Sequence, residues 1–323
     1  MKNLLEIKDL KVTFPTDDGF VHAVDGVSLT VAPGETVAIV GESGSGKTVT
    51  SLSVIGLHNR KVTQISGSIL VKDKDESLDI VNAPLDKIRS YRGRVVSMIF
   101  QDPMSSLHPY YRIGSQLAEA YLVHNPGQKE AAHKKAVEML ALVGIPEPEV
   151  RAKEYPHQFS GGMRQRVMIA MALMNDPAVL IADEPTTALD VTIQAQILDL
   201  MRNLQKQMNM SILLITHDLG VVAENCDRVL VMYAGKIVES GKTAEVFANP
   251  THPYTQALLN SSPRAAKNVK KHLPTIEGMV MPPAQRGTGC SFAPRCSRVI
   301  EKCHSQTPQL DNSDHAVACW NQL

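Results

Sequence analysis

One glycine-rich segment constrains the fold of this chain more than any other feature. Residues 41–48 match the pattern G-x-x-x-x-G-K-[ST] and read Gly41-Glu42-Ser43-Gly44-Ser45-Gly46-Lys47-Thr48. The apolar residues 37–40 before it indicate a buried strand, and we expect a helix to start within residues 44–48 and to run to about residue 57. A strand, loop and helix of this kind bind phosphate in α/β folds, so the sequence predicts a nucleotide-binding protein.

The residue types in this loop suit phosphate groups. Its glycines let the backbone curl so that successive N–H groups converge on phosphate oxygens. The N-terminus of the following helix adds a partial positive charge. We expect Lys47 to reach the β- and γ-phosphates and the Thr48 hydroxyl to take one Mg²⁺ position. The whole loop, together with Thr50 on the helix, is therefore the candidate nucleotide contact.

A pair of carboxylates closes a later apolar strand. The segment reads Ile181-Ala182-Asp183-Glu184, and the C-terminal ends of such strands are where α/β sheets place their ligands. We expect Asp183 to hold Mg²⁺ through water and Glu184 to polarise the attacking water as a general base. Without the phosphate loop this pair would equally suit a solvated strand end. Together, the two features favour nucleotide hydrolysis.

Strand and helix patterns alternate on both sides of a helical middle. We expect strands at residues 4–7, 11–14, 27–31, 36–40, 67–72, 95–100, 179–182, 211–216, 228–232 and 236–240, those at 67–72 and 95–100 forming a pair. Residues 113–174 have a helical pattern, with one helix at 128–143. A helix at 191–208 should bury a stripe made of Ile193, Ile197, Leu200, Leu204 and Met208. The alternation predicts a parallel sheet with helices on its faces, and a separate C-terminal appendage should begin near residue 251.

Composition argues for an ordinary globular protein. Among 323 residues, 33 basic side chains balance 33 acidic ones, so no global field attracts nucleic acid or anionic lipid. Disordered, collagen-like and coiled-coil chains are excluded by the same composition. Glu6 and Asp9 interrupt the first apolar stretch, which breaks the pattern of a signal peptide, and apolar runs stay far below the ~20 residues of a membrane helix. We expect a soluble, cytoplasmic chain of about two domains.

Further motifs point to a family. They follow in the order Ile99-Phe100-Gln101-Asp102-Pro103, Phe159-Ser160-Gly161-Gly162-Met163-Arg164-Gln165-Arg166, Asp183-Glu184-Pro185-Thr186, Ala188-Leu189-Asp190 and Thr216-His217-Asp218. With the phosphate loop, they resemble the ATPase subunit of ABC transporters over about residues 4–260. Phe159 and Met163 stand where the family signature usually has Leu and Gln. The resemblance implies an α/β P-loop NTPase: a RecA-like parallel-sheet core, an N-terminal antiparallel β subdomain and a helical subdomain inserted at about residues 105–175.

The resemblance also implies roles for the motif residues in MgATP hydrolysis. Gln101 would sense Mg²⁺ and the attacking water and would link to the membrane subunit, and His217 would touch the γ-phosphate. The expected catalytic residues are then Lys47, Gln101, Glu184 and His217. The expected Mg²⁺ ligands are Thr48, Gln101 and Asp183.

Other family motifs imply contacts with a partner ATPase and with adenine. Ser160, Gly161 and Gly162 would clamp the γ-phosphate of the ATP held by the partner, and their N–H groups open a helix that faces an anion. Asp190 would cross the dimer interface. Phe14 would stack on adenine, with Phe20 as the alternative because residues 15–19 look inserted.

Longer segments resemble the oligopeptide/dipeptide branch of the family, namely residues 100–104, 155–163, 182–194 and 252–255. The branch usually has Asn where this chain has His108. The resemblance implies the ATP-hydrolysing motor of a di- or oligopeptide importer, peripheral on the cytoplasmic face of the cell membrane. Its partners would be a second ATPase chain in a heterodimer, two transmembrane permease subunits and an extracytoplasmic peptide-binding protein, with no nucleic acid. Alternatives are another cargo (a nickel complex, glutathione or an antimicrobial peptide), a soluble ABC-type ATPase, or a metal-sensing or redox module.

Four cysteines crowd into the C-terminal tail, at Cys290, Cys296, Cys303 and Cys319. In a chain without an export signal, clustered thiols indicate metal more often than disulfides. Their spacing matches neither zinc ribbons nor common ferredoxins. The tail resembles the extension of peptide-importer ATPases, which implies a [4Fe–4S] cluster; Zn²⁺ and free thiols are the alternatives. We accordingly divide the chain into an ATPase domain, residues 1–255, and an extension, residues 256–323.

Overall fold

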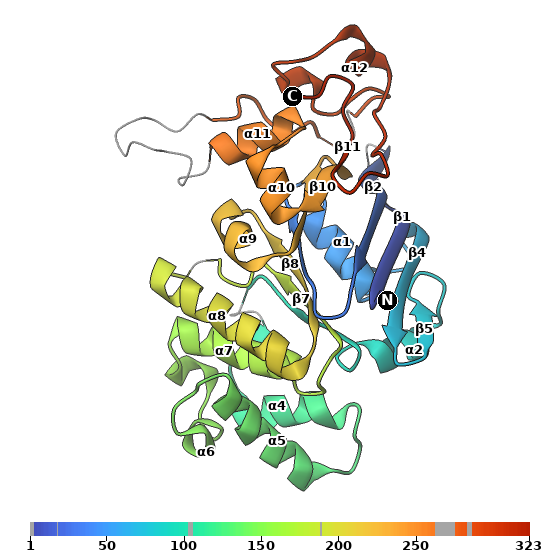
Figure 1. Cartoon of the computed structure of the whole chain (residues 1–323). Coiled ribbons are helices and arrows are strands. Elements are labelled where there is room, and N and C mark those ends of the chain that lie inside the picture. Colours follow the sequence, from blue (N-terminus) through green and yellow to red (C-terminus); the bar gives the residue numbers. More distant parts are fainter. Residues whose placement is uncertain (1–2, 18, 103–105, 188, 262–274, 283–285) are drawn as a thin grey trace.

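The computed structural model describes residues 3–17, 19–102, 106–187, 189–261, 275–282 and 286–323 (Figure 1). Its larger sheet has seven strands in the order β11-β10-β9-β3-β8-β7-β6. These strands are β11 (Ala316–Val317), β10 (Lys236–Lys242), β9 (Arg228–Tyr233), β3 (Thr36–Val40), β8 (Ser211–Thr216), β7 (Val179–Asp183) and β6 (Val96–Ile99). Neighbours from β9 to β6 run parallel, whereas β10 and β11 are antiparallel additions at one edge.

The centre of this sheet follows directly from the sequence. Every residue of β3, β7 and β8 is buried. Parallel strands covered on both faces read as nearly continuous apolar runs, which is the pattern of these three segments. The predicted strands at residues 36–40, 179–182 and 211–216 are therefore confirmed, and the sheet is the parallel core that the alternation predicted.

A second, antiparallel sheet holds the N-terminal residues in the order β2-β1-β4-β5. Its strands are β1 (Leu5–Thr16), β2 (Gly19–Val31), β4 (Gln64–Asp73) and β5 (Glu76–Asp79). The two short strands expected at residues 4–7 and 11–14 are one strand, β1, interrupted by a register shift near Asp9, whose φ is +45°. The expected pairing of 67–72 with 95–100 is wrong, because β4 and β6 lie in different sheets.

Helices cover the main sheet and form an inserted group between β6 and β7. They are α1 (Lys47–Val54), α2 (Leu85–Tyr91), α4 (Ile113–Leu122), α5 (Lys129–Leu142), α6 (Pro148–Arg151), α7 (Gly161–Ala172), α8 (Val191–Met208) and α9 (Leu219–Asn225). The insertion, α4 to α7, lies at the opposite end of the molecule from the C-terminal region in Figure 1. Among the residues described, none of the helices is both long enough and apolar enough to span a membrane.

Helix α8 has the predicted bounds but a different buried face. Its buried residues are Ile197, Leu198, Met201, Leu204 and Gln205. Of the predicted stripe, Ile193, Leu200 and Met208 are only partly buried. The stripe is shifted because α8 packs against α7 and the sheet through the face centred on Met201, which joins the same apolar cluster as α7.

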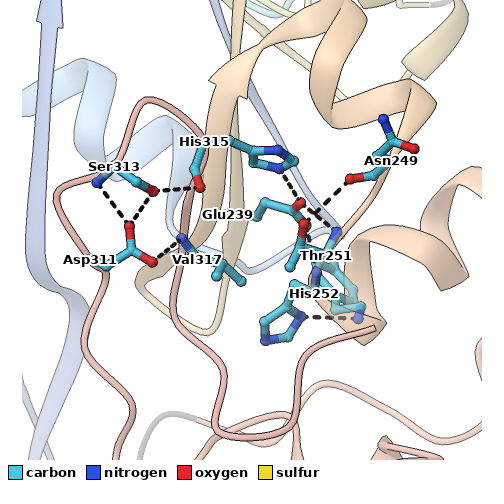
Figure 2. A network of polar contacts seen from close by, with 9 residues as sticks. Glu239, Asn249, Thr251, His252, Asp311, Ser313, His315 and Val317 are labelled. Carbon is cyan, nitrogen blue, oxygen red and sulfur yellow. Dashed lines mark hydrogen bonds and ion pairs between the residues drawn. The ribbon is translucent and has the colours of Figure 1, made fainter.

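The C-terminal region comprises α10 (Thr243–Ala248), α11 (Pro253–Asn260), α12 (Glu301–Ser305) and β11. Strand β11 pairs with β10, where Val317 lies opposite Glu239. The Glu239 carboxylate is fully buried and accepts hydrogen bonds from the backbone N–H groups of Thr251, at 2.7 Å, and His252, at 2.9 Å. His315 Nε2 lies 2.7 Å from the same carboxylate (Figure 2). The expected appendage is therefore not separate but extends the main sheet; the boundary at residue 255 stays a prediction.

Candidate nucleotide-binding site

The glycine-rich loop connects β3 to α1, as the sequence predicts. A Cβ added at Gly41 would lie 2.1 Å from the carbonyl oxygen of Met232, and one at Gly46 would lie 2.6 Å from that of Ala23. Gly46 also has a φ of +106°, a conformation that side chains rarely adopt. Close backbone packing therefore requires glycine at both positions, independently of any bound phosphate.

Lys47 occupies the position predicted for a phosphate-binding lysine. It begins α1, and its side chain is buried with the ammonium turned back onto the loop. Nζ donates to the carbonyl oxygens of Gly41, at 2.8 Å, and Glu42, at 3.0 Å. Burial lowers the pKa of Lys47, while the carboxylates of Glu184 and Asp183 oppose this shift. The Lys47 ammonium thus lies close to backbone carbonyls of the loop and to the carboxylates at the end of β7.

The other loop residues divide into exposed and buried groups. Ser43 and Gly44 are exposed at the tip, and Thr48 is exposed at the start of α1. The Ser45 hydroxyl is buried and has no hydrogen-bond partner within the described part of the chain. Thr50 is fully buried, and its hydroxyl donates to the carbonyl oxygen of Gly46 at 3.0 Å. Thr50 therefore stabilises the C-terminal end of the loop. Its direct contact with a nucleotide stays a prediction.

Asp183 ends β7 beside the loop. It is 1% exposed; its Oδ2 lies 3.5 Å from Ser51 Oγ, and its Oδ1 is buried with no partner among the described atoms. Burial raises the pKa of Asp183, while a hydrogen bond with the Thr48 side chain opposes the rise. A buried carboxylate oxygen in need of a partner, next to a threonine hydroxyl, is a set of oxygen donors that suits Mg²⁺. These residues therefore fit the predicted metal.

Glu184 is the centre of a polar cluster at the same strand ends. Its Oε2 accepts from Gln101 Nε2 at 3.0 Å and from Thr187 Oγ1 at 2.9 Å, and its Oε1 lies 3.3 Å from His217 Nδ1. Burial would raise the pKa of Glu184, but its hydrogen bonds with Thr187 and His217 outweigh this, so the pKa is lowered. The carboxylate is thus ionised at neutral pH. The structure brings three predicted catalytic residues, Glu184, Gln101 and His217, into one cluster.

The signature residues and Asp190 lie at the starts of α7 and α8. Ser160 caps α7 by accepting from Met163 N at 3.3 Å, and Asp190 caps α8 by accepting from Ile193 N at 2.9 Å. The two caps are neighbours, since a Cβ added at Gly162 would lie 3.0 Å from Ile193 Cγ2. Ser160, Gly161 and Asp190 are exposed. Pro103 and Ala188, which belong to two of the motifs, lie outside the described residues.

The two aromatic candidates for adenine differ in environment. Phe14 is partly buried, packs on the core of the antiparallel sheet and meets His58 edge to face, with ring centroids 5.6 Å apart. His58 Nε2 in turn lies 3.0 Å from the carbonyl oxygen of Val49, next to the loop. Phe20 is the second residue of β2 and is 57% exposed. The stacking role of either ring stays a prediction.

Two residues that sequence reasoning missed contact Glu42 in the phosphate loop. The Glu42 N–H donates to the Tyr254 hydroxyl at 3.0 Å, and Arg295 Nη1 donates to the Glu42 carboxylate at 2.9 Å. Tyr254 had a signal, since it belongs to a segment that resembles the peptide branch. Arg295 had none beyond its place before Cys296. Thr187, which bonds Glu184, was also missed.

The four tail cysteines belong to one folded region but show no metal site. The backbone N–H of Cys290 donates to the Cys303 carbonyl at 2.8 Å, and Cys296 Sγ accepts from Arg298 N at 3.4 Å. None of the four forms a disulfide. Burial raises the pKa of Cys290, Cys296 and Cys319. Within the described residues, which include all four, no three metal-binding side chains gather around one point, so neither [4Fe–4S] nor Zn²⁺ is confirmed.

A phosphate loop on a parallel sheet, with an ionised carboxylate cluster at the neighbouring strand ends, defines a P-loop nucleotide-binding protein. Family comparison then assigns the particular group. The model described as "ABC transporter" matches residues 24–187, and "Oligopeptide/dipeptide transporter, C-terminal region" matches residues 238–303. The chain belongs to the ABC transporter family, as one of its ATPase chains.

Relatives span nearly the full length of the chain. It is 51% identical to a putative peptide import ATP-binding protein of Brucella melitensis, over 99% of this chain and 98% of the relative. It is also 51% identical to the dipeptide transport ATP-binding protein DppD of Bacillus subtilis, over 100% of this chain and 96% of the relative. Among solved structures, the dimeric ATP-binding cassette MJ0796 with ADP and Pi has a TM-score of 0.65 and 26% identity, covering 74% of this chain and 98% of the cassette.

Proposed function

We propose that this chain is the ATP-hydrolysing subunit of an ABC importer for di- or oligopeptides. The proposal is supported by family membership, by the match of its C-terminal region to oligopeptide/dipeptide transporters, and by relatives named for peptide import along almost the whole chain. The observation that carries hydrolysis is the ionised Glu184 carboxylate, which Gln101 and His217 contact beside the phosphate loop.

In this proposal the loop residues bind the ATP phosphates. The Lys47 ammonium leaves the carbonyls that it now contacts and turns to phosphate oxygens, while the N–H groups at the start of α1 face the same charge. Thr48, Asp183 and Gln101 would hold Mg²⁺, which would neutralise charge on the phosphates. Phe14 or Phe20 stacks on adenine.

Glu184 orients and polarises the attacking water, and His217 contacts the γ-phosphate. Because the carboxylate is ionised and bonded on both oxygens, its direction is set before substrate binds. Replacing it with Gln keeps the shape but removes the negative charge that accepts the proton.

We further propose that the chain works in a pair with a second ATPase chain. Ser160, Gly161 and Asp190 are exposed side by side at the starts of α7 and α8, where a partner can reach them. A structural relative is a dimeric cassette bound to ADP and Pi. The pair would bind two permease subunits at the cytoplasmic face of the membrane, and an extracytoplasmic binding protein would deliver the peptide. Co-purification with membrane subunits tests this arrangement; a chain that never enters a membrane complex would contradict it.

The four cysteines are proposed to hold a [4Fe–4S] cluster, with Zn²⁺ as the alternative. Four thiols suit either group in number and softness, and all lie within one short region. Protein purified without oxygen should be brown and contain iron with acid-labile sulfide. Colourless protein with stoichiometric zinc would reject the cluster in favour of zinc, and protein with neither metal would reject both.

The decisive experiment for the main proposal compares the importer complex carrying the unaltered chain with one carrying Glu184→Gln. We expect the variant to bind MgATP normally and to lose about 100-fold or more of the turnover at the site that this chain forms. Asp199→Asn is a matched control, because Asp199 pairs with Arg202 on the exposed side of α8. Normal turnover by Glu184→Gln would refute the assignment.

A further inference from the structure

The C-terminal region contacts the phosphate loop at Glu42. Arg295 Nη1 donates to Glu42 Oε2 at 2.9 Å, and the Arg295 side chain is only 6% exposed. From another direction, the fully buried Tyr254 accepts the Glu42 N–H at 3.0 Å. The two contacts join residues 253 and 212 positions apart in the chain. The second residue of the loop is thus bonded through both its side chain and its backbone to elements that follow the ATPase motifs.

Arg295 is itself rigidly placed. Its Nε donates to the Glu277 carbonyl at 2.9 Å, its Nη2 to the Ile276 carbonyl at 3.1 Å, and its Nη1 also to the Tyr233 hydroxyl at 3.3 Å. A planar guanidinium with several fixed acceptors has little freedom to turn. Burial works against the charge, but the bonds to Glu42 and Tyr233 prevail and raise the pKa of Arg295. Arg295 therefore presents a fixed positive charge to Glu42.

Glu42 also contacts the lysine of the phosphate loop through its backbone. Its carbonyl oxygen accepts from Lys47 Nζ at 3.0 Å and from Ser45 N at 3.3 Å. Lys47 Nζ also donates at 2.8 Å to the Gly41 carbonyl, which belongs to the same peptide group as the Glu42 N–H that Tyr254 accepts. The lysine therefore contacts the peptide groups on both sides of the residue that Arg295 and Tyr254 hold.

The charge of Glu42 matters as much as its position. The carboxylate is 26% exposed, and its Oε1 has no hydrogen-bond partner among the described atoms. Without Arg295, an unpaired negative charge would stand within the phosphate loop. It would repel nucleotide phosphates and attract the Lys47 ammonium away from them, and both effects weaken phosphate binding.

We propose that Arg295 is a positioning residue for the phosphate loop, through which the C-terminal region sets the affinity for MgATP and MgADP. Arg295 neutralises the Glu42 carboxylate and fixes its side chain, so that the residue keeps its position beside Lys47. The proposal rests on the proposed role of the loop in nucleotide binding. It gives the region after α11 a role in the ATPase itself, because a movement of Ile276, Glu277 or Arg295 would change the contact with Glu42 in the phosphate loop.

The test measures MgADP binding to the full-length chain by calorimetry. Arg295→Met keeps the bulk of the side chain but removes its charge, and we expect affinity to fall about tenfold, within the usual range for coupled neighbours. Arg298→Met is the matched control, because Arg298 lies in the same region but bonds to Asn321 and Gln322 instead. The control should bind within about twofold of the unaltered chain. In the importer complex, Arg295→Met should raise the KM for ATP and leave kcat unchanged.

A double-mutant cycle separates this role from general loosening of the fold. In a Glu42→Gln background the carboxylate charge is gone, so Arg295→Met should weaken MgADP binding by less than about twofold. An equal loss in both backgrounds would overturn the proposal, as would an Arg295→Met variant that binds like the unaltered chain. If Arg295→Met fails to fold, Arg295→Gln, which also removes the charge, takes its place in the same cycle with the same expected outcome. Absence of MgADP binding by the unaltered chain would instead overturn the proposed function, and this inference with it.

Discussion

Replacing Glu239 with alanine should release the C-terminal region from the main sheet. The carboxylate is fully buried in β10 and is the acceptor for two backbone N–H groups, those of Thr251 and His252 (Figure 2). His315 Nε2, one residue before β11, contacts it from the C-terminal side. A single side chain therefore ties the turn before α11 and the last strand to the sheet.

The magnitude follows from what the substitution leaves unpaired. Each buried N–H without an acceptor costs about 1–3 kcal/mol. Two such groups, together with the loss of the His315 contact, give a destabilisation of about 3–5 kcal/mol, near the upper end for one substitution. Glu239→Gln retains one acceptor oxygen and should lose about half as much.

The chain has a single tryptophan, Trp320, and it lies in the region concerned. Its indole Nε1 donates to the Gln306 carbonyl at 3.0 Å, so its fluorescence reports this region directly. For Glu239→Ala the midpoint of the fluorescence transition in urea should fall by about 1–1.7 M, given a slope of about 3 kcal/mol per M. Glu245→Ala is the control, because Glu245 pairs with Lys242 on the surface, and it should shift stability by less than about 0.5 kcal/mol. A Glu239→Ala transition that coincides with that of the control would refute the reasoning.

Three further outcomes follow from particular contacts. Burial lowers the pKa of His252 to about 4, so the imidazole is neutral in the folded chain and its Nδ1 accepts from Tyr254 N. In the unfolded chain this imidazole has its usual pKa of about 6.5, so its contribution to stability should be complete above that pH and should fall as the pH drops toward 4. His252→Asn keeps a capping oxygen but cannot bind this proton, so its urea midpoint should depend less on pH than that of the unaltered chain. An unchanged pH dependence of the midpoint would contradict this assignment. Gly46→Ala would bring a Cβ within 2.6 Å of a carbonyl oxygen at a φ of +106°, so calorimetry should detect no MgADP binding and stability should drop by about 1–3 kcal/mol; wild-type affinity would be the contrary result. Asp183→Asn should weaken the binding of Mg²⁺, so ATP hydrolysis should need a higher Mg²⁺ concentration to reach half of its maximal rate. An unaltered half-maximal concentration would remove Asp183 from the proposed metal site.

Local patterns predicted most of the central sheet and the composition of the site. Strands β3, β7 and β8 are nearly continuous apolar runs because both their faces are covered, and such runs are recognisable without neighbours. The site residues come from motifs whose chemistry depends on residue type and short spacing. The cluster around Glu184 could be anticipated for Gln101 and His217, because both follow predicted strands that end at the same edge of a parallel sheet.

Errors arose where pairing or orientation depends on distant segments. Three features are of this kind: the register shift in β1, the separate sheets of β4 and β6, and the shifted buried face of α8. Each depends on the segments that pack against the element, and the hydrophobic periodicity of the element does not contain that information.

The sequence by itself determined that this chain binds phosphate in an α/β fold and that it resembles the ATPases of peptide importers, because glycine, lysine and carboxylate motifs act over a few neighbouring residues. Only the tertiary structure shows that the C-terminal region is bonded to the main sheet at Glu239 and to the phosphate loop through Arg295. A hydrogen bond between residues 253 positions apart leaves no periodic trace in the chain. It exists because folding buries the Arg295 guanidinium beside the Glu42 carboxylate, and a buried charge requires partners.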